Sequence, residues 1–170
     1  AVEPGDSAVL LLVLAKGGVP VSQQFYMFGG STLGSFRRFA LPITYSSAVV
    51  PDSLTIGFVS TNPFSSTYDS HPTSFIAFDD LSFTPASQPI LNGNLEQWID
   101  YPHEQPEEWH HPLFIGIDSA DFNQQEVKKI IHALPDDYAV EITPATLNGS
   151  AFPSDFSNIM KVMGPDVHGS

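Results

Sequence analysis

Acidic and amide side chains gather in the middle of the chain, on either side of a short link. Asp79 and Asp80 end an apolar run, and Asn92, Asn94 and Glu96 begin the next one. Carboxylate and amide oxygens are the hard ligands that Ca²⁺ prefers. If the two runs lie side by side, these residues predict a structural calcium site. The alternative is that the two aspartates only end a strand and that Asn92 opens a turn with the following glycine.

Aromatic side chains in polar loops form a second set of candidates. Phe64 and Tyr68 lie in the polar, Pro-punctuated stretch 61–72, and Tyr101 lies in the acidic stretch 100–111. Aromatic rings combine a large apolar face with a defined geometry, which suits stacking on sugars. The three residues therefore predict a glycan-binding surface. The alternative for each is that it only anchors its loop.

The tryptophans and histidines indicate structure rather than chemistry. Trp98 and Trp109 could stack on sugars, but we expect these large side chains to be in the core. His110 and His111 would point to opposite faces of a strand, so with His103 they would not chelate one ion as histidines four apart on a helix do. A zinc site is not expected from these or from the other histidines of the chain, His71, His132 and His168.

Catalysis is not expected from the sequence. The chain has no cysteine, which excludes thiol catalysis and Cys-ligated metal sites. No nucleophile elbow and no phosphate-binding glycine loop is present. With 19 Asp and Glu residues some pair of carboxylates is always available, and nothing marks one pair for hydrolysis. We therefore expect a protein without enzymatic activity.

Composition favours an all-β protein. The 170 residues include 15 Pro and 12 Gly but only 15% charged residues, a profile typical of many turns and few helices. The formal charge of −13 repels phosphate backbones, so nucleic acid is not an expected partner. The apolar run Ala8–Ala15 is far shorter than the ~20 residues of a membrane span and predicts a buried strand instead of membrane insertion.

The first half of the chain shows strand patterns. Ser7–Lys16 and Val19–Phe28 flank a Gly-Gly turn and predict a hairpin. Ser35–Ile43 alternates like a half-exposed strand, Leu54, Ile56 and Phe58 share one face of another, and Thr73–Phe83 reads as a central strand.

The second half is less regular. The sequence predicts strands over 90–99, 113–117, 138–143 and 159–163. Residues 121–134 leave two alternatives open, because the apolar residues from Val127 to Leu134 have helical spacing yet could also form one arm of a hairpin that turns at 135–137.

Several short motifs resemble a known family. In the first half they are residues 5–8 with the strand to Lys16, 41–45, 51–53 with the strand to Ser60, and 78–83; in the second half they are 91–98, 106–109, 127–133 and 138–142. The first group is similar to the C-terminal half, and the second group to the N-terminal half, of carbohydrate-binding-module-like jelly-roll domains. Such domains occur in secreted and surface proteins of bacteria that use type IX secretion, including the carbohydrate metabolism domain group.

The resemblance implies an antiparallel β-sandwich of the jelly-roll type with its halves in reversed order. Residues 1–83 would be the C-terminal half, 84–89 a link and 90–170 the N-terminal half. The Tyr-rich strand that usually joins the halves has no visible counterpart. The chain is then either circularly permuted or spans two repeats, in which case strands from another copy would complete it. The resemblance also favours the hairpin over the helix for residues 121–134. It implies a calcium ion among Asp79, Asp80, Asn92, Asn94 and Glu96.

Two functions follow from these observations. The first is a non-catalytic, extracellular carbohydrate-binding module with glycan or polysaccharide as its partner and a structural Ca²⁺. The second is a surface structural or adhesive subunit whose open edges pair head-to-tail with copies of itself to form a filament. Both place the protein outside the cell or on its outer surface, and the fold alone does not separate them.

Overall fold

The computed structural model describes residues 2, 4–29, 35–62, 64–65, 73–84, 89–100, 104–109, 127–132, 137–147, 150–152 and 155–161. Within these ranges the chain is all-β, contains no helix, and pairs its strands in antiparallel fashion, which is consistent with a β-sandwich. Among the same residues no helix has the length and apolar character needed to cross a membrane.

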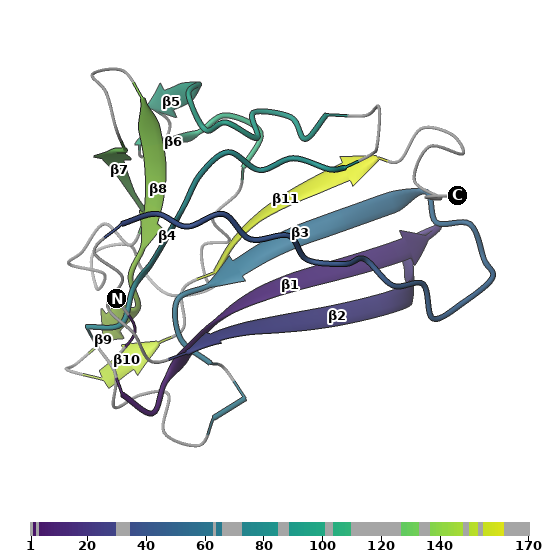
Figure 1. Cartoon of the computed structure of the whole chain (residues 1–170), viewed down its shortest axis with the longest axis horizontal. Helices are drawn as coiled ribbons and strands as arrows, with labels where there is room; N and C mark the ends of the chain where they lie inside the picture. The colour runs from purple at the N-terminus through teal and green to yellow at the C-terminus, as the bar shows by residue number, and fades with distance from the viewer. Residues whose placement is uncertain are drawn as a thin grey trace.

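The largest sheet is built around the predicted hairpin. Strands β1 (Ser7–Lys16) and β2 (Val19–Gly29) pair through the Gly-Gly turn, which confirms that prediction. Strand β3 (Ser53–Val59) pairs with the other side of β1, and β11 (Asp155–Lys161) completes the order β11-β3-β1-β2 (Figure 1). The sheet therefore joins the beginning of the chain to its last described strand.

A second sheet has the order β4-β8-β7. It contains β4 (Ile76–Phe78), β8 (Tyr138–Ile142) and β7 (Val127–Ile131). Strands β7 and β8 form a hairpin with Ile131 opposite Tyr138, so the helical alternative is wrong for the described part of 121–134. Two small pairs complete the strands: β5 (Trp98–Asp100) with β6 (Glu104–Pro106), and β9 (Ala145–Leu147) with β10 (Ser150–Phe152).

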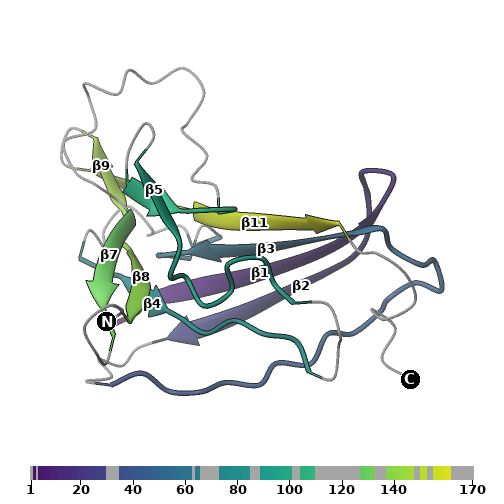
Figure 2. The same ribbon diagram turned by 90° about the horizontal axis from the view of Figure 1, so that it is seen from above.

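The hydrophobic core lies between these layers. Alternate residues of β1 and β3 point into it, including Leu12 and Phe58, and they meet side chains from the second sheet such as Phe78 and Val140. The rings of Phe58 and Phe78 stack with centroids 3.7 Å apart. Strands β7 and β8 run across one end of the larger sheet (Figure 2). The described core thus draws on residues both before and after the 84–89 link.

The predicted strand Ser35–Ile43 is not a strand. The described residues from 35 to 50 form an extended segment that runs alongside the larger sheet (Figures 1 and 2). Side chains attach it to β2: Gln24 Nε2 donates to Thr44 Oγ1 (2.7 Å), Thr44 N donates to Gln24 Oε1 (3.0 Å), and the Tyr26 hydroxyl bonds to the Pro42 carbonyl. Pro42 lacks an N–H, so at its position the segment cannot donate a backbone hydrogen bond to β2.

The predicted strands 73–83 and 90–99 are much shorter in the structure. Only Ile76–Phe78 and Trp98–Asp100 are paired, and Leu91–Asn94 form a turn. Residues before and after 84–89 still meet, because Leu81 N donates to Gly93 O over 2.7 Å. The region between the short strands is therefore fixed by turn geometry instead of strand pairing. The predicted strand 113–117 lies outside the described residues.

Asp52 anchors the β1–β2 turn to the start of β3, which yields a pH prediction. Gly17 N donates to both Asp52 oxygens at 3.1 Å, and Lys16 Nζ lies 3.5 Å from Oδ2. This hydrogen bonding and the Lys16 charge lower the pKa of Asp52 below its ordinary 3.8. A depressed folded-state pKa contributes stability that is present at neutral pH and is lost as the pH falls through the folded value.

We expect Asp52→Asn to lower the free energy of unfolding at pH 7, and this difference from the wild type should shrink as the pH is taken below about 4. Urea titrations between pH 3 and 7 measure it. Asp100→Asn, at an exposed carboxylate outside this turn, is the control for the loss of one negative charge. A difference at position 52 that is constant over the whole range would contradict this assignment.

Candidate functional site

Asp79 is a buried carboxylate at the end of β4. Its side chain is only 3% exposed. Asp80 follows with a positive φ of 51° and its backbone N–H donates to Asp79 Oδ1 over 2.7 Å. Aspartate tolerates this left-handed conformation better than most residues. The local turn therefore holds the Asp79 carboxylate in a fixed position at the end of β4.

His132 and Asp137 flank the turn of the β7–β8 hairpin. The strand register ends with Ile131 opposite Tyr138, so the next residue on each arm, His132 and Asp137, face each other. The backbone confirms this, because His132 N donates to Asp137 O over 2.8 Å. The hairpin thus brings an imidazole and a carboxylate to one place.

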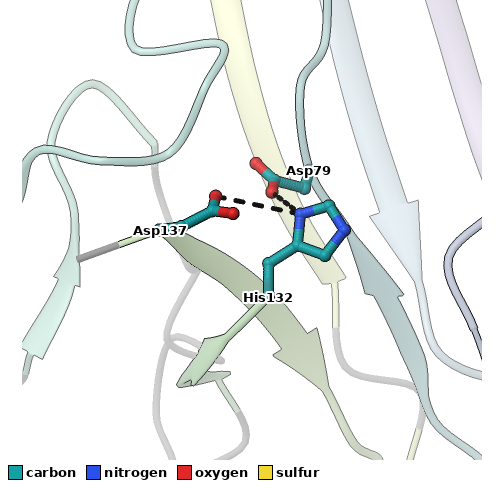
Figure 3. A group of neighbouring side chains, drawn as sticks. All are labelled: Asp79, His132 and Asp137. Carbon is teal, nitrogen blue, oxygen red and sulfur yellow. Dashed lines mark hydrogen bonds and ion pairs between the residues drawn. The ribbon is translucent and has the colours of Figure 1, made fainter. Parts of the chain in front are cut away.

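These three residues form what we call the Asp-His-Asp cluster (Figure 3). His132 Nδ1 lies 2.6 Å from Asp79 Oδ2 and 3.9 Å from Asp137 Oδ1. One ligand atom from each residue lies within 4.8 Å of the others, which makes the cluster the group within the described residues that could hold a metal ion. His132 and Asp137 are 24% and 34% exposed, so an ion could reach the cluster from solvent.

Electrostatics and packing constrain the cluster further. Burial raises the pKa of Asp79 above its ordinary value, and the Asp80 hydrogen bond and the contact with His132 offset that rise in part. The Phe36 ring lies against the imidazole with centroids 4.0 Å apart and an angle of 45° between the rings. The imidazole is therefore restricted on one side by an aromatic ring and on the other by carboxylates.

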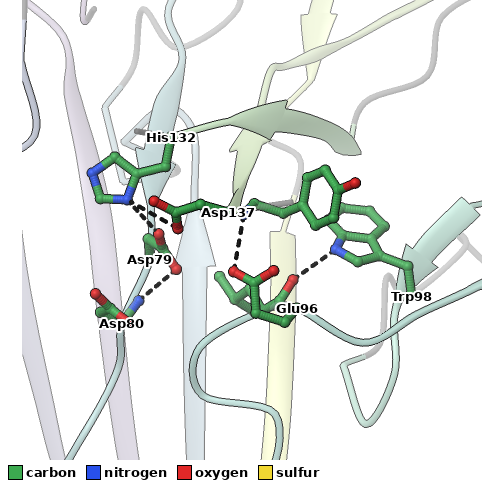
Figure 4. Close-up of polar contacts among 8 residues, drawn as sticks. Asp79, Asp80, Glu96, Trp98, His132 and Asp137 are labelled. Carbon is green, nitrogen blue, oxygen red and sulfur yellow. Dashed lines mark hydrogen bonds and ion pairs between the residues drawn. The ribbon is translucent and has the colours of Figure 1, made fainter. Parts of the chain in front are cut away.

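The calcium ligands expected from the sequence are only partly brought together. Asp79 belongs to the cluster, and the Asp80 side chain is exposed. Glu96 lies close by, but its Oε1 accepts a hydrogen bond from Tyr138 N over 2.9 Å (Figure 4). Asn94 is exposed in the turn.

Asn92 has a structural task. Its φ is 45°, its Nδ2 donates to the carbonyls of Gln97 and Glu107 at 2.8 Å, and its Oδ1 accepts from Gln97 N at 3.1 Å. Its own carbonyl accepts from Trp109 Nε1 at 3.2 Å. The amide is therefore occupied in holding the 91–97 turn against the segment after β6.

Phe64 is the expected aromatic ligand that the structure describes; Tyr68 and Tyr101 lie outside the described residues. Phe64 is 65% exposed, and its ring meets the edge of Phe25 with centroids 5.2 Å apart. Phe25 itself is 46% exposed. These two rings form an exposed aromatic pair, which the sequence reading missed because Phe25 sits within a strand.

The pair lies at the outer face of the larger sheet. Because Tyr26 and Phe28 pack against the core, Phe25 and Met27 point away from it. Phe25 stands opposite Leu11 and Met27 opposite Val9 on the neighbouring strand. This outer face carries the apolar side chains of Leu11, Val13, Phe25, Met27 and Val59, which are partly or fully exposed, with Phe64 beside them. Val9 belongs to the same side of the sheet but is only 1% exposed.

The two tryptophans differ in burial. Trp109 is 1% exposed and belongs to the core, as expected. Trp98 is partly buried and packs against the core; its Nε1 donates to Leu95 O over 2.6 Å, and Lys129 Nζ lies 5.1 Å above its ring. Neither ring is therefore free on both faces.

From the sequence, His132 was one of six histidines for which no zinc site was expected, and Asp137 was expected only to form part of a turn; neither was linked to Asp79. The usable signal was the hairpin alternative, because residues at the two ends of a tight turn face each other. Nothing in the spacing of these residues relative to Asp79 indicated that β4 would pair with β8.

Comparison with protein-family models, with curated proteins and with solved structures gives no significant match to this chain.

Proposed function

We propose that the protein is a non-catalytic, extracellular carbohydrate-binding module of the jelly-roll type. The proposal takes residues 1–83 and 90–170 as the two halves of one sandwich in reversed order, joined by 84–89. The shared core supports it, since Phe58 and Phe78 from the first part pack with Trp109 from the second. The resemblance of the sequence motifs to secreted domains supports the location outside the cell.

The observation that carries the glycan assignment is the exposed Phe25–Phe64 pair on the outer face. Exposed aromatic rings cost free energy in water and are seldom gathered without a reason. The faces of the two rings are nearly perpendicular, at 89°, so they can contact two surfaces of one sugar chain. The neighbouring apolar residues of the sheet would provide a flat platform for sugar CH groups.

The experiment is retention of the purified protein on insoluble cellulose, chitin and xylan. We expect at least one polysaccharide to retain the wild type and Phe25→Ala or Phe64→Ala to weaken binding at least ~10-fold, the equivalent of about 1.4 kcal/mol. Phe39→Ala is the matched control, because Phe39 is 58% exposed and also meets one other phenylalanine, Phe28, by its edge at 5.3 Å.

Phe39→Ala should bind as the wild type does. Equal binding by all three variants would contradict the proposed surface. Retention on none of the polysaccharides, together with concentration-dependent light scattering, would favour the second function, assembly by strand exchange. The covering of β2 by residues 41–46 argues against pairing at that edge, because Gln24 and Ser22 already hold Thr44 there.

A further inference from the structure

The Asp-His-Asp cluster leaves one carboxylate without a hydrogen bond from the imidazole. Nδ1 lies 2.6 Å from Asp79 Oδ2 and can share only one hydrogen bond, which that distance gives to Asp79. Asp137 Oδ1 lies 3.9 Å from the same nitrogen, too far for a hydrogen bond. Two carboxylates thus share one imidazole, and one of them, Asp79, is almost fully buried. A single cation among the three atoms would be contacted by all of them.

We propose that Asp79, His132 and Asp137 bind one divalent ion of the zinc class through Asp79 Oδ2, His132 Nδ1 and Asp137 Oδ1. In the bound form the ion replaces the Nδ1 proton, which is released to solvent. The fourth position is taken by water, as in zinc sites with three protein ligands.

The ligand set distinguishes zinc from calcium. Ca²⁺ takes six to eight oxygen ligands, whereas the cluster offers one nitrogen and two carboxylates. Imidazole nitrogen suits Zn²⁺ and its neighbours in the transition series. Two ligand atoms of a tetrahedral zinc at bond lengths of about 2.0–2.2 Å lie about 3.4 Å apart. The observed separations of 2.6 and 3.9 Å lie on either side of that value, and all three ligand atoms lie within 4.8 Å of one another, so side-chain adjustments on the order of 1 Å would form the site.

The surroundings hold the ligands in place before an ion arrives. The Asp80 N–H fixes the other oxygen of Asp79. The His132 N–H and the Asp137 carbonyl hold the two arms of the hairpin together. Phe36 lies against the imidazole and limits its rotation. Supporting contacts of this kind raise metal affinity, because less order is lost on binding.

An ion here would join two distant parts of the chain. Asp79 and His132 are 53 positions apart, and the 84–89 link lies between them. Binding would therefore stabilise the contact between the end of β4 and the β7–β8 hairpin. Because ions that bind only the folded state raise its stability with the logarithm of their concentration, thermal unfolding provides an independent readout.

The test uses the full chain after removal of metal with EDTA. Isothermal titration with ZnCl₂ should give one site per chain, with affinity at least ~100-fold above that for CaCl₂. His132→Ala and Asp137→Asn should each weaken zinc affinity at least ~100-fold, since loss of even an outer-shell contact costs 10- to 100-fold. Co²⁺ in place of Zn²⁺ should show the absorption of a tetrahedral ion with the wild type but not with His132→Ala or Asp137→Asn.

Two control variants identify the ligands. Asp80→Asn removes a neighbouring exposed carboxylate, and His111→Ala removes a histidine outside the described residues; both should bind zinc as the wild type does. Asp137→Asn changes a partly exposed side chain, so circular dichroism should show it folded.

Calcium affinity equal to that of zinc, zinc binding lost in His111→Ala but kept in His132→Ala, or no uptake of zinc would each overturn the proposal. The titrations contain no glycan, so their outcome does not depend on the proposed function.

Discussion

Gly93→Ala is expected to destabilise the fold by about 3 kcal/mol or more, at the upper end of the cost of overpacking. A Cβ at this buried position would overlap the Leu81 carbonyl oxygen and come within 3.1 Å of Ile90 Cβ. The two backbones cannot separate freely, because Leu81 N donates to Gly93 O over 2.7 Å. The substitution must therefore either break that hydrogen bond or displace the 91–94 turn.

Urea denaturation of the two proteins measures the effect. Gly29→Ala is the matched control at an exposed strand end. A Cβ there would come 3.2 Å from the flexible Ser7 side chain and 3.7 Å from the Asp6 carbonyl oxygen, which is an ordinary contact. It should change the free energy of unfolding by less than about 0.5 kcal/mol. If Gly93→Ala changed the free energy of unfolding as little as Gly29→Ala, the close contact between Leu81 and Gly93 would not exist in solution.

Trp109→Ala is expected to cost about 3–5 kcal/mol, the usual range for removing a large buried aromatic side chain. Trp109 is 1% exposed, its ring lies 6.2 Å from Phe58 and 6.0 Å from Phe78, and its Nε1 donates to Asn92 O. The substitution leaves a cavity where residues from before and after the 84–89 link meet. Chemical and thermal unfolding should both report the loss.

Trp98→Ala serves as the comparison, because Trp98 is only partly buried and should cost clearly less. If the two substitutions were equally mild, below about 1 kcal/mol, the two parts of the chain would not share one core. A broad or two-step unfolding transition in the wild type would point in the same direction, because a shared core unfolds cooperatively.

The strands of the larger sheet could be predicted from the sequence where pattern and turn signals agree. The hairpin of β1 and β2 combines a wholly apolar strand with a Gly-Gly turn, and β3 shows clear alternation of Leu54, Ile56 and Phe58. In β7 the local pattern was ambiguous, because Val127, Ile130 and Ile131 fit either period. Pairing with β8, a contact made in three dimensions, decides for the strand.

The position of the extended segment 35–50 could not be predicted, because its contacts with β2 are made by individual side chains. The alternation of Leu41 and Ile43 correctly indicates a half-buried extended chain. A pattern of period two does not, however, distinguish pairing through the backbone from attachment through Gln24 and Tyr26. Likewise, residues 90–99 were predicted as a strand, whereas Asn92 and Gly93 lie in a turn, as the alternative interpretation of these two residues had it.

The residues of the candidate sites could also be predicted only in part. Asp79 was identified from its position after an apolar run, and Phe64 from its position in a polar loop. Their partners, His132 and Phe25, were not identified, because strand order determines whether their segments lie near Asp79 and Phe64. Local sequence therefore indicated the residue types, and the topology determined which of them meet.

The most direct test of the glycan assignment is residue-resolved NMR of the labelled protein, titrated with short cello-, chito- and xylo-oligosaccharides. The account predicts that one of these ligands shifts signals on the outer face, with Leu11, Phe25, Met27 and Phe64 the most affected and the Asp-His-Asp cluster unchanged. No shift at saturating sugar, or shifts confined to residues away from that face, would contradict it.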